Sequence, residues 1–282
     1  MKSSKDWDWE IRPAQSGWRL GLAEIIHYKD LLLRFAERDL SLRYKQTIIG
    51  PFWNFLQPLL TTIVYVVVFG KIAKISTDGA PPVLFFLAGT IIWAFFSDCF
   101  HSVQYTFISN AHIFSKVYFP RLVVPLSIIL SQSIRFLIQL LLFMAIYLFY
   151  FFYFKNVYPS WYILLLPVLL LLTAGFALGL GLIVSVFVAK YRDLESLTQI
   201  LLRLFMFATP VIYPLSIIPE KYKIWFWLNP LTWVLKTFRA AFLTHQEISV
   251  TNMMVSLVSV VVILLIGIIL FKNKELKVMD TI

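Results

Sequence analysis

Three polar side chains repeat along one face of a long apolar stretch. Gln132, Arg135 and Gln139 follow the spacing i, i+3, i+7, which aligns them on one side of a helix. The preceding apolar stretch carries a single acid, Asp98. Ionisable side chains inside a membrane-spanning helix are costly, and they are usually either paired with each other or used in function. These four residues are therefore the first candidates for a functional site.

Asp98 and Arg135 lie at similar depths if both stretches span a membrane. Counting about 1.5 Å per residue from the predicted cytoplasmic ends places Asp98 about 15 Å deep and Arg135 about 20 Å deep, so the two could meet. Two interpretations follow. Either the polar residues line a route for a substrate, or Asp98 and Arg135 form a structural ion pair.

Motifs for catalysis are absent. The sequence has no G-x-x-x-x-G-K-[ST] phosphate loop, no H-E-x-x-H and no G-x-S-x-G. Its four histidines are scattered, and its one cysteine, Cys99, excludes an intramolecular disulfide and a multi-cysteine metal site. Asp6-Trp7-Asp8 has the D-x-D form of some metal-dependent sugar transferases, but a lone D-x-D in a polar tail is a weak signal. We expect no catalytic residue, metal site or cofactor in this chain.

The composition is that of a membrane protein. The 282 residues are 60% hydrophobic and 17% aromatic, and the mean hydropathy is +0.79. A soluble domain of this size could not bury that much apolar surface, and several runs approach the 20 apolar residues that cross a bilayer. The net charge of +10 fits cytoplasmic loops and anionic lipid, so no nucleic acid is expected. The N-terminus is polar and lacks the apolar region of a signal peptide.

We expect an all-α polytopic membrane protein with six transmembrane helices. The predicted spans are 52–70, 83–108, 122–154, 161–189, 197–211 and 250–271. Residues 1–19 form a cytosolic polar lead-in, 20–49 an amphipathic interface helix region, 50–275 the transmembrane domain and 276–282 a cytosolic tail. Residues 210–247 are rich in proline and too polar for a clean span, and they predict a re-entrant helical hairpin between helices five and six. A five-span or seven-span arrangement of 197–271 stays open.

The N-terminal helix joins the first span at Gly50-Pro51. Charged and apolar residues of 31–45 separate onto two sides of a helix, as in a helix lying on a membrane surface. Asp39 and Arg43 break this pattern, and their i, i+4 spacing allows them to pair, or each to be solvated alone. Gly50-Pro51 is expected to end the helix, and Pro58 to kink the first span.

Orientation follows from the distribution of Lys and Arg. They concentrate in the N-terminal region, the 109–121 and 190–203 connections and the C-terminal tail, so these segments are predicted to be cytoplasmic. An even number of spans places both termini on that side.

Several short segments, taken in order, resemble segments of type-2 ABC transporter permeases. The most similar group within that family exports O-antigen, capsule or teichoic-acid polysaccharides. The resemblance covers about residues 20–275 and rests on four groups of residues taken together. These are Arg38-Asp39, Tyr44-Lys45, Gly50-Pro51-Phe52-Trp53 and Gln57-Pro58 at the first span; Lys116-Val117-Tyr118-Phe119-Pro120-Arg121 and Pro125-Leu126 before the third; Tyr191-Arg192-Asp193-Leu194 before the fifth; and Asn229-Pro230-Leu231 in the hairpin.

This resemblance implies an assembly and a cargo. Such a permease pairs with a second copy of itself and docks on two copies of a separate ABC ATPase subunit, which binds ATP and Mg²⁺. The implied cargo is a polysaccharide on a polyprenyl diphosphate lipid, moved out across the bacterial cytoplasmic (inner) membrane.

The resemblance also implies roles for residues. ATPase coupling is expected at Arg38 and Asp39 and in a small helix of the 109–121 loop, with a solvated connector as the alternative for the loop. The loop residues are Ala111, His112, Ile113, Phe114, Ser115 and Lys116. The route for the substrate is expected at Asp98, Gln132, Arg135 and Gln139, where Arg135 meets the lipid diphosphate or the sugars. Hinge or re-entrant roles are expected at Gly50, Pro51, Pro58, Asn229 and Pro230.

Other functions remain open on the sequence. Within the ABC class, the cargo could be teichoic acid, a small molecule or a drug. A membrane-embedded glycosyltransferase or acyltransferase would need an acidic metal site or a catalytic histidine on a sizeable loop, and the loops are short. A flippase or secondary transporter would need more intramembrane acids than Asp98.

Overall fold

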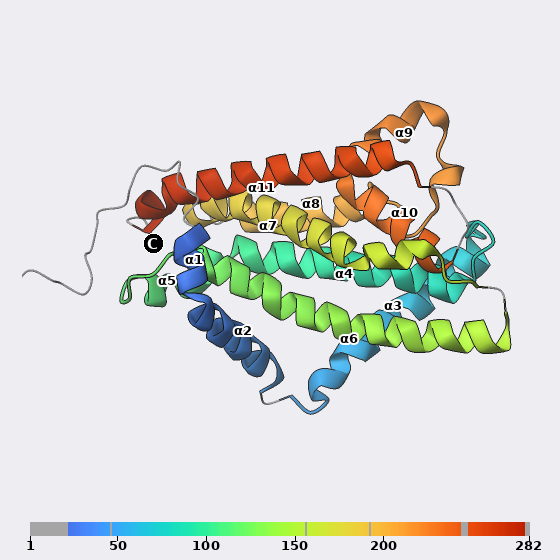
Figure 1. Ribbon diagram of the computed structural model, residues 1–282, viewed down its shortest axis with the longest axis horizontal. Coiled ribbons are helices and arrows are strands. Elements are labelled where there is room, and N and C mark those ends of the chain that lie inside the picture. Colours follow the sequence, from blue (N-terminus) through green and yellow to red (C-terminus); the bar gives the residue numbers. More distant parts are fainter. Residues whose placement is uncertain (1–21, 46, 156, 192, 244–247, 280–282) are drawn as a thin grey trace, which may run out of the picture.

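The computed structural model is a bundle of long helices (Figure 1) and describes residues 22–279 apart from 46, 156, 192 and 244–247. The lead-in predicted for 1–19 lies outside the described residues. Within them there is no strand. The elements are α1 (Leu22–His27), α2 (Lys29–Tyr44), η1 (Gly50–Phe52), α3 (Trp53–Tyr65), η2 (Val66–Ile72, a π-helix), α4 (Pro82–Gln104), α5 (Thr106–Phe114), α6 (Val123–Tyr153), η3 (Trp161–Leu165), α7 (Leu166–Lys190), α8 (Leu194–Phe207), η4 (Leu215–Ile217), α9 (Glu220–Trp227), α10 (Pro230–Phe242) and α11 (Val250–Met279).

Five helical stretches of the described chain are long and apolar enough to cross a membrane. They are Gly50–Ile72, Pro82–Gln104, Val123–Tyr153, Trp161–Lys190 and Val250–Glu275. The helix predicted as the fifth span is α8, which has 14 residues. At about 1.5 Å per residue it measures about 21 Å, which is shorter than a hydrocarbon core of about 30 Å.

α4 lies at the centre of the bundle. Most of its side chains are buried, and the helix packs against α3, α6, α7 and α10. Large aromatic side chains pack around it. For example, Phe96 stacks on Phe176 of α7 at 5.3 Å between ring centroids. α7 also crosses α11 at close range. A Cβ added at Gly179 would lie 2.8 Å from the backbone nitrogen of Leu264, so this crossing requires glycine.

The N-terminal helix ends earlier than predicted. α2 stops at Tyr44, where Lys45 takes an extended conformation, and not at Gly50-Pro51. Gly50 instead has φ +55°, a left-handed conformation that favours glycine, and Pro51 occupies the first turn of the next helix. The two residues therefore start the first span. α2 and α3 form a V beside α6, to which both pack (Figure 1).

α1, α5 and the C-terminal end of α11, which belong to segments predicted to be cytoplasmic, lie at one end of the bundle (Figure 1). Phe107 of α5 stacks on Phe271 of α11 at 4.6 Å. Arg121 lies 3.9 Å from Glu275, so the connection before α6 also contacts the end of α11. α11 continues to Met279, beyond the stop predicted after residue 271.

The opposite end holds the 208–242 region. Ser216 donates a hydrogen bond to Asp78 in the loop between α3 and α4, at 2.6 Å. The backbone nitrogen of Ser160 donates to the carbonyl of Ala241 at the end of α10, at 2.9 Å. The chain therefore reaches this end after α8, forms α9 and α10 there, and starts α11 from the same end (Figure 1).

Candidate functional site

Asp98 and Arg135 meet inside the bundle. A nitrogen of the Arg135 guanidinium lies 3.0 Å from a carboxylate oxygen of Asp98, which joins α6 to α4. The two side chains differ in access, because 10% of the Arg135 side chain and 42% of the Asp98 side chain are exposed. The pair is therefore closed on the arginine side and open on the carboxylate side.

Further polar side chains extend the pair into a network across four helices. Arg135 donates to the side-chain oxygens of Gln132, at 2.6 Å, and Asn54, at 3.3 Å. Gln132 in turn donates to Ser102 at 3.1 Å, and Asn54 donates to the hydroxyl of Tyr44 at 2.6 Å. The network thus links the end of α2, the first turn of α3, α4 and α6.

Three of these partners were not predicted from the sequence. Tyr44, Asn54 and Ser102 are ordinary polar residues near helix ends, and no local spacing relates them to Arg135. Asn54 carried one usable signal, because it is an amide in the first turn of an apolar span and is buried in the fold. Gln139, which was predicted, is buried farther along α6.

The predicted pair of Asp39 and Arg43 is replaced by another arrangement. Arg38 donates to the Asp39 carboxylate from two nitrogens, at 2.9 and 3.1 Å. Partial burial and then the charge of Arg135 lower the pKa of the Arg43 guanidinium, whereas the charges of Asp98, Tyr44 and Asp39 raise it. The i, i+4 spacing allowed Arg43 to pair with Asp39, but in the structure the guanidinium of the adjacent Arg38 binds the Asp39 carboxylate instead.

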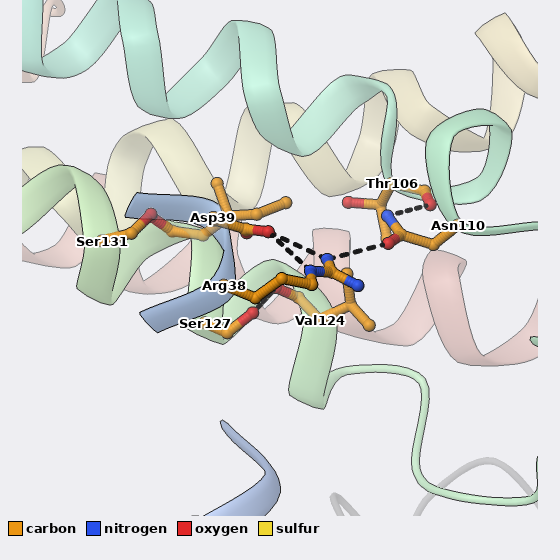
Figure 2. A network of polar contacts seen from close by, with 8 residues as sticks. Arg38, Asp39, Thr106, Asn110, Val124, Ser127 and Ser131 are labelled. Carbon is orange, nitrogen blue, oxygen red and sulfur yellow. Dashed lines mark hydrogen bonds and ion pairs between the residues drawn. The ribbon is translucent and has the colours of Figure 1, made fainter. Parts of the chain in front are cut away.

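A second polar cluster joins the two predicted ATPase-coupling segments. Figure 2 shows Arg38 of α2 between Asp39 and Asn110 of α5, to which it donates at 3.4 Å. Asn110 is fixed by its own bond to the carbonyl of Thr106, at 3.1 Å. The Arg38 guanidinium also covers the ring of Phe35 at 4.9 Å. Arg38 thus links α2 to α5, beside the apolar packing of Phe35 and Phe114 in one cluster.

The predicted small helix of the 109–121 loop is the second half of α5, followed by a turn. Its side chains divide by exposure. Phe114 is buried against Phe107 and Phe119, so it anchors the loop. Ala111 and Ile113 are half-buried, and the exposed ones are His112, Ser115 and Lys116.

Comparison with known proteins gives the family. The model of the family described as ABC-2 type transporter matches residues 31–243. The chain belongs to the ABC-2 type transporter family.

Relatives within this family are named for polysaccharides. The O-antigen export system permease protein RfbA of Myxococcus xanthus is 30% identical over 225 residues, which is 79% of this chain and 84% of the relative. The protein of the same name from Klebsiella pneumoniae is 29% identical over 78% and 85% of the two chains. The polysialic acid transport protein KpsM of Escherichia coli is 24% identical over 84% and 91%.

The residues predicted as hinges of this ABC-2 transporter have distinct surroundings. Pro58 is buried inside α3, which continues through it. Asn229 caps α10: its side chain accepts from the backbone nitrogen of Leu231, at 3.0 Å, and donates to the hydroxyl of Thr209, at 2.8 Å. Pro230 occupies the first turn of α10. Asn229 therefore ties the start of α10 to the end of α8.

The transporter holds a second buried arginine, Arg239, to which the sequence did not lead us to assign a role. Arg239 of α10 donates to the carbonyls of Pro210, at 2.8 Å, and Val211, at 2.5 Å, just after α8. Its guanidinium also lies 3.6 Å from the ring centroid of Phe85. A signal was present, since Arg239 follows Leu235 by four residues and Leu231 by eight on the apolar side of a helix.

Proposed function

We propose that this chain is the permease subunit of an ATP-driven exporter that moves a lipid-linked polysaccharide out across the cytoplasmic membrane. Similarity over about four-fifths of the chain to permeases named for O-antigen and polysialic acid carries the proposal. The cargo named for each relative is a polysaccharide, which favours this class over small molecules and drugs. Teichoic acid is an alternative within the same class.

The permease works as a pair of identical subunits on two copies of a separate ATPase subunit. The sequence has no phosphate loop of its own, so ATP and Mg²⁺ belong to that partner. α2 and the exposed part of α5 rest on the ATPase. Because Arg38 joins these helices at Asn110, a displacement of one carries the other with it.

The network around Arg135 forms part of the translocation route near the cytosolic side. It offers amide, hydroxyl and charged groups in a bundle that is otherwise apolar, which suits a cargo rich in hydroxyl groups and headed by a phosphate. The partly exposed Asp98 marks the side from which the cargo approaches. Structural pairing of Asp98 and Arg135 is compatible with this use, since an ion pair can open when a cargo arrives.

The membrane domain crosses the membrane six times, with both termini in the cytoplasm. α8 covers part of the fifth crossing, and the irregular segment 208–219 completes it. Backbone inside a membrane must be hydrogen-bonded within the protein, and Arg239 supplies donors to this segment. α9 and α10 form the re-entrant hairpin. The clustering of the basic N-terminal, 109–121 and C-terminal segments at one end supports this orientation.

Deletion of the gene in its host tests the function. We expect lipid-linked polymer to accumulate on the cytoplasmic face and to disappear from the cell surface, while synthesis of the polymer continues. Restoring the wild-type gene should return the polymer to the surface. Loss of polymer synthesis instead of its export would contradict the proposal and favour a glycosyltransferase.

Cross-linking tests the coupling surface. Cysteines placed at His112 or Ser115 should cross-link to the ATPase in an active complex, because both side chains are exposed at the end of α5. A cysteine placed at Tyr153, exposed at the far end of α6, is the control. Absence of any cross-link from 112 and 115 would show that the loop is a solvated connector.

A further inference from the structure

A cavity of about 190 Å³ lies between α4, α6, α7 and α10. Its floor is formed by buried side chains of α4 and α10, which are Ile92, Phe95, Val234 and Phe238. The mouth lies between α6 and α7, because the exposed residues of the lining are Leu137 and Pro167. The cavity therefore opens sideways from the bundle and reaches inward to α4 and α10.

The lining of this cavity is apolar. Thr173 is the one lining residue with a polar side chain, and its hydroxyl donates to the carbonyl of Leu169 within α7, at 2.8 Å. An apolar cavity of this kind does not hold water. Leu137 lies near the middle of α6, a helix of 31 residues, so the mouth is at the depth of the hydrocarbon core of a bilayer.

The cavity is separate from the polar network around Arg135. Neither Arg135 nor Asp98 lines it. Phe136 follows Arg135 in α6 and therefore points about 100° further around the helix. The Phe136 ring packs on Phe95 of α4 at 4.9 Å between centroids, and both rings line the cavity. The cavity thus offers surface for a hydrocarbon and no group for a diphosphate.

An occupant made of hydrocarbon would stabilise this part of the bundle. Side chains around an empty space lose dispersion contacts on one side, and the volume exceeds that of an apolar cavity of about 150 Å³ that takes up benzene. Leu141 and Leu171, one turn beyond Leu137 and Pro167, are 66% and 69% exposed. The outer surface beside the mouth is therefore apolar, and the hydrocarbon chains of the bilayer lie directly at the opening.

We propose that this cavity binds the hydrocarbon tail of a membrane phospholipid, which enters sideways between α6 and α7. Phospholipid surrounds the mouth in large excess over any carrier lipid, and the polar groups suited to a carrier diphosphate lie outside the cavity. The tail contacts α4 and α10 together, so it adds to the packing that holds α10 in the bundle. The inference does not depend on the cargo of the permease.

Photolabelling of the full-length permease in lipid nanodiscs tests this site. The nanodiscs contain a phosphatidylethanolamine with an alkyl diazirine at the end of one acyl chain, and mass spectrometry of fragmented peptides identifies the labelled residues. We expect label on Ile92, Phe95 and Val234, which are at most 3% exposed, as well as on the exposed Leu141. Label on Leu141 without any on the floor would overturn the inference.

Filling the cavity should remove the label from its floor. Leu170 is a half-buried lining residue, and Leu170→Trp should reduce the label on Ile92 and Phe95 about fivefold, because the indole occupies the space of the tail. Val234→Phe fills the cavity from the floor and serves if Leu170→Trp fails to fold, which thermal unfolding shows. Undiminished label on the floor in a folded, filled variant would overturn the inference.

Leu171→Trp is the matched control. Leu171 is the next residue of α7, but it is exposed and does not line the cavity, so its replacement should leave the label on Ile92 and Phe95 unchanged. Equal losses of label in Leu170→Trp and Leu171→Trp would show that a general change in lipid contact, and not occupation of the cavity, is measured.

Competition identifies the source of the hydrocarbon. Unlabelled undecaprenyl diphosphate, added as a minor component of the nanodisc lipid, should leave the label on the floor unchanged. Loss of that label would show that the cavity takes the isoprenoid chain of a carrier lipid, and it would overturn the assignment to phospholipid. No arm of the experiment measures transport, so its failure leaves the export function to be decided by the gene deletion.

Discussion

Two buried arginines occupy opposite parts of the membrane domain and bind different kinds of partner. Arg135 contacts the side chains of Asp98, Gln132 and Asn54. Arg239 contacts the backbone carbonyls of residues 85, 210 and 211 and the ring of Phe85. Both are charged groups in a bundle of apolar helices, but Arg135 bonds to side chains, among them the partly exposed Asp98, whereas Arg239 bonds to backbone carbonyls.

The kind of partner indicates the role. Side chains can rotate away and exchange with a cargo, so a site built from them can open and close. Carbonyls of an irregular segment cannot move without moving the chain, and inside a membrane they require a donor from the protein. We therefore propose that Arg239 stabilises the 208–219 segment and that Arg135 acts in transport.

Replacing Arg239 should cost the most stability. Arg239→Leu leaves the carbonyls of Pro210 and Val211 buried without their donors, at about 1–3 kcal/mol each. We expect a large fall in the thermal unfolding temperature of the purified permease and a fall in its yield. Arg239→Lys keeps the charge but not the planar guanidinium. Its unfolding temperature should lie between those of the wild type and Arg239→Leu. If Arg239→Leu unfolded at the wild-type temperature, Arg239 would not stabilise the 208–219 segment.

Gly89 tests the same region by steric means. A Cβ added there would overlap the Val211 carbonyl and lie 2.9 Å from a guanidinium nitrogen of Arg239. Gly89→Ala should therefore destabilise the permease by about 1–3 kcal/mol. Gly70→Ala is the control, because its Cβ would meet Phe86 at an ordinary 3.6 Å. Equal unfolding temperatures for the two variants would contradict the close contact.

Replacing Arg135 should affect export more than stability. In Arg135→Gln the partly exposed Asp98 can be solvated, so we expect a loss of about 1 kcal/mol in folding. Export of polymer to the cell surface should fall about tenfold. The measurement pairs surface polymer with the thermal unfolding temperature of the same variant. If the unfolding temperature of Arg135→Gln fell enough to account for the loss of surface polymer, Arg135 would have a structural role like that of Arg239.

Replacing Arg38 should have the smallest effect on stability. Its ion pair with Asp39 is partly exposed, so Arg38→Ala should cost less than about 1 kcal/mol. Export per ATP hydrolysed should nevertheless fall, because α2 and α5 lose their link at Asn110. Arg34→Ala, which breaks an exposed pair on the same helix, serves as the control. If export per ATP hydrolysed were unchanged in Arg38→Ala, the link between α2 and α5 would not serve coupling, and α2 would act only as a membrane anchor.

Helices with long, uninterrupted apolar runs were predictable from the sequence. The span predicted at 122–154 is α6, Val123–Tyr153, because nothing within the run competes with a helix. The end of α2 was wrong by several residues. Gly50-Pro51 gave a strong signal for a boundary, but that boundary is the start of the first span at η1, and the chain leaves α2 at Lys45 without a proline or glycine.

Part of the site was also predictable. The meeting of Asp98 and Arg135 followed from counting residues along two spans, since depth in a membrane is set by helix rise. The contributions of Asn54 and Tyr44 were not predictable, because they depend on how α2 and α3 fold back against α6. Arg239 was missed for another reason: it lies in the segment predicted as a re-entrant hairpin, where no single polar residue was assigned a role, although its helical spacing places it among buried side chains.

Export by the double variant Asp98→Ala/Arg135→Ala tests the division between the two arginines most directly. The assay is ATP-dependent transfer of lipid-linked polysaccharide into inverted membrane vesicles that contain the permease and its ATPase. Removal of both charges leaves no unpaired ion, so the variant should fold, and we expect it to remain as defective in transfer as Arg135→Ala alone. Recovery of wild-type transfer in the double variant would show that Arg135, like Arg239, serves only the fold.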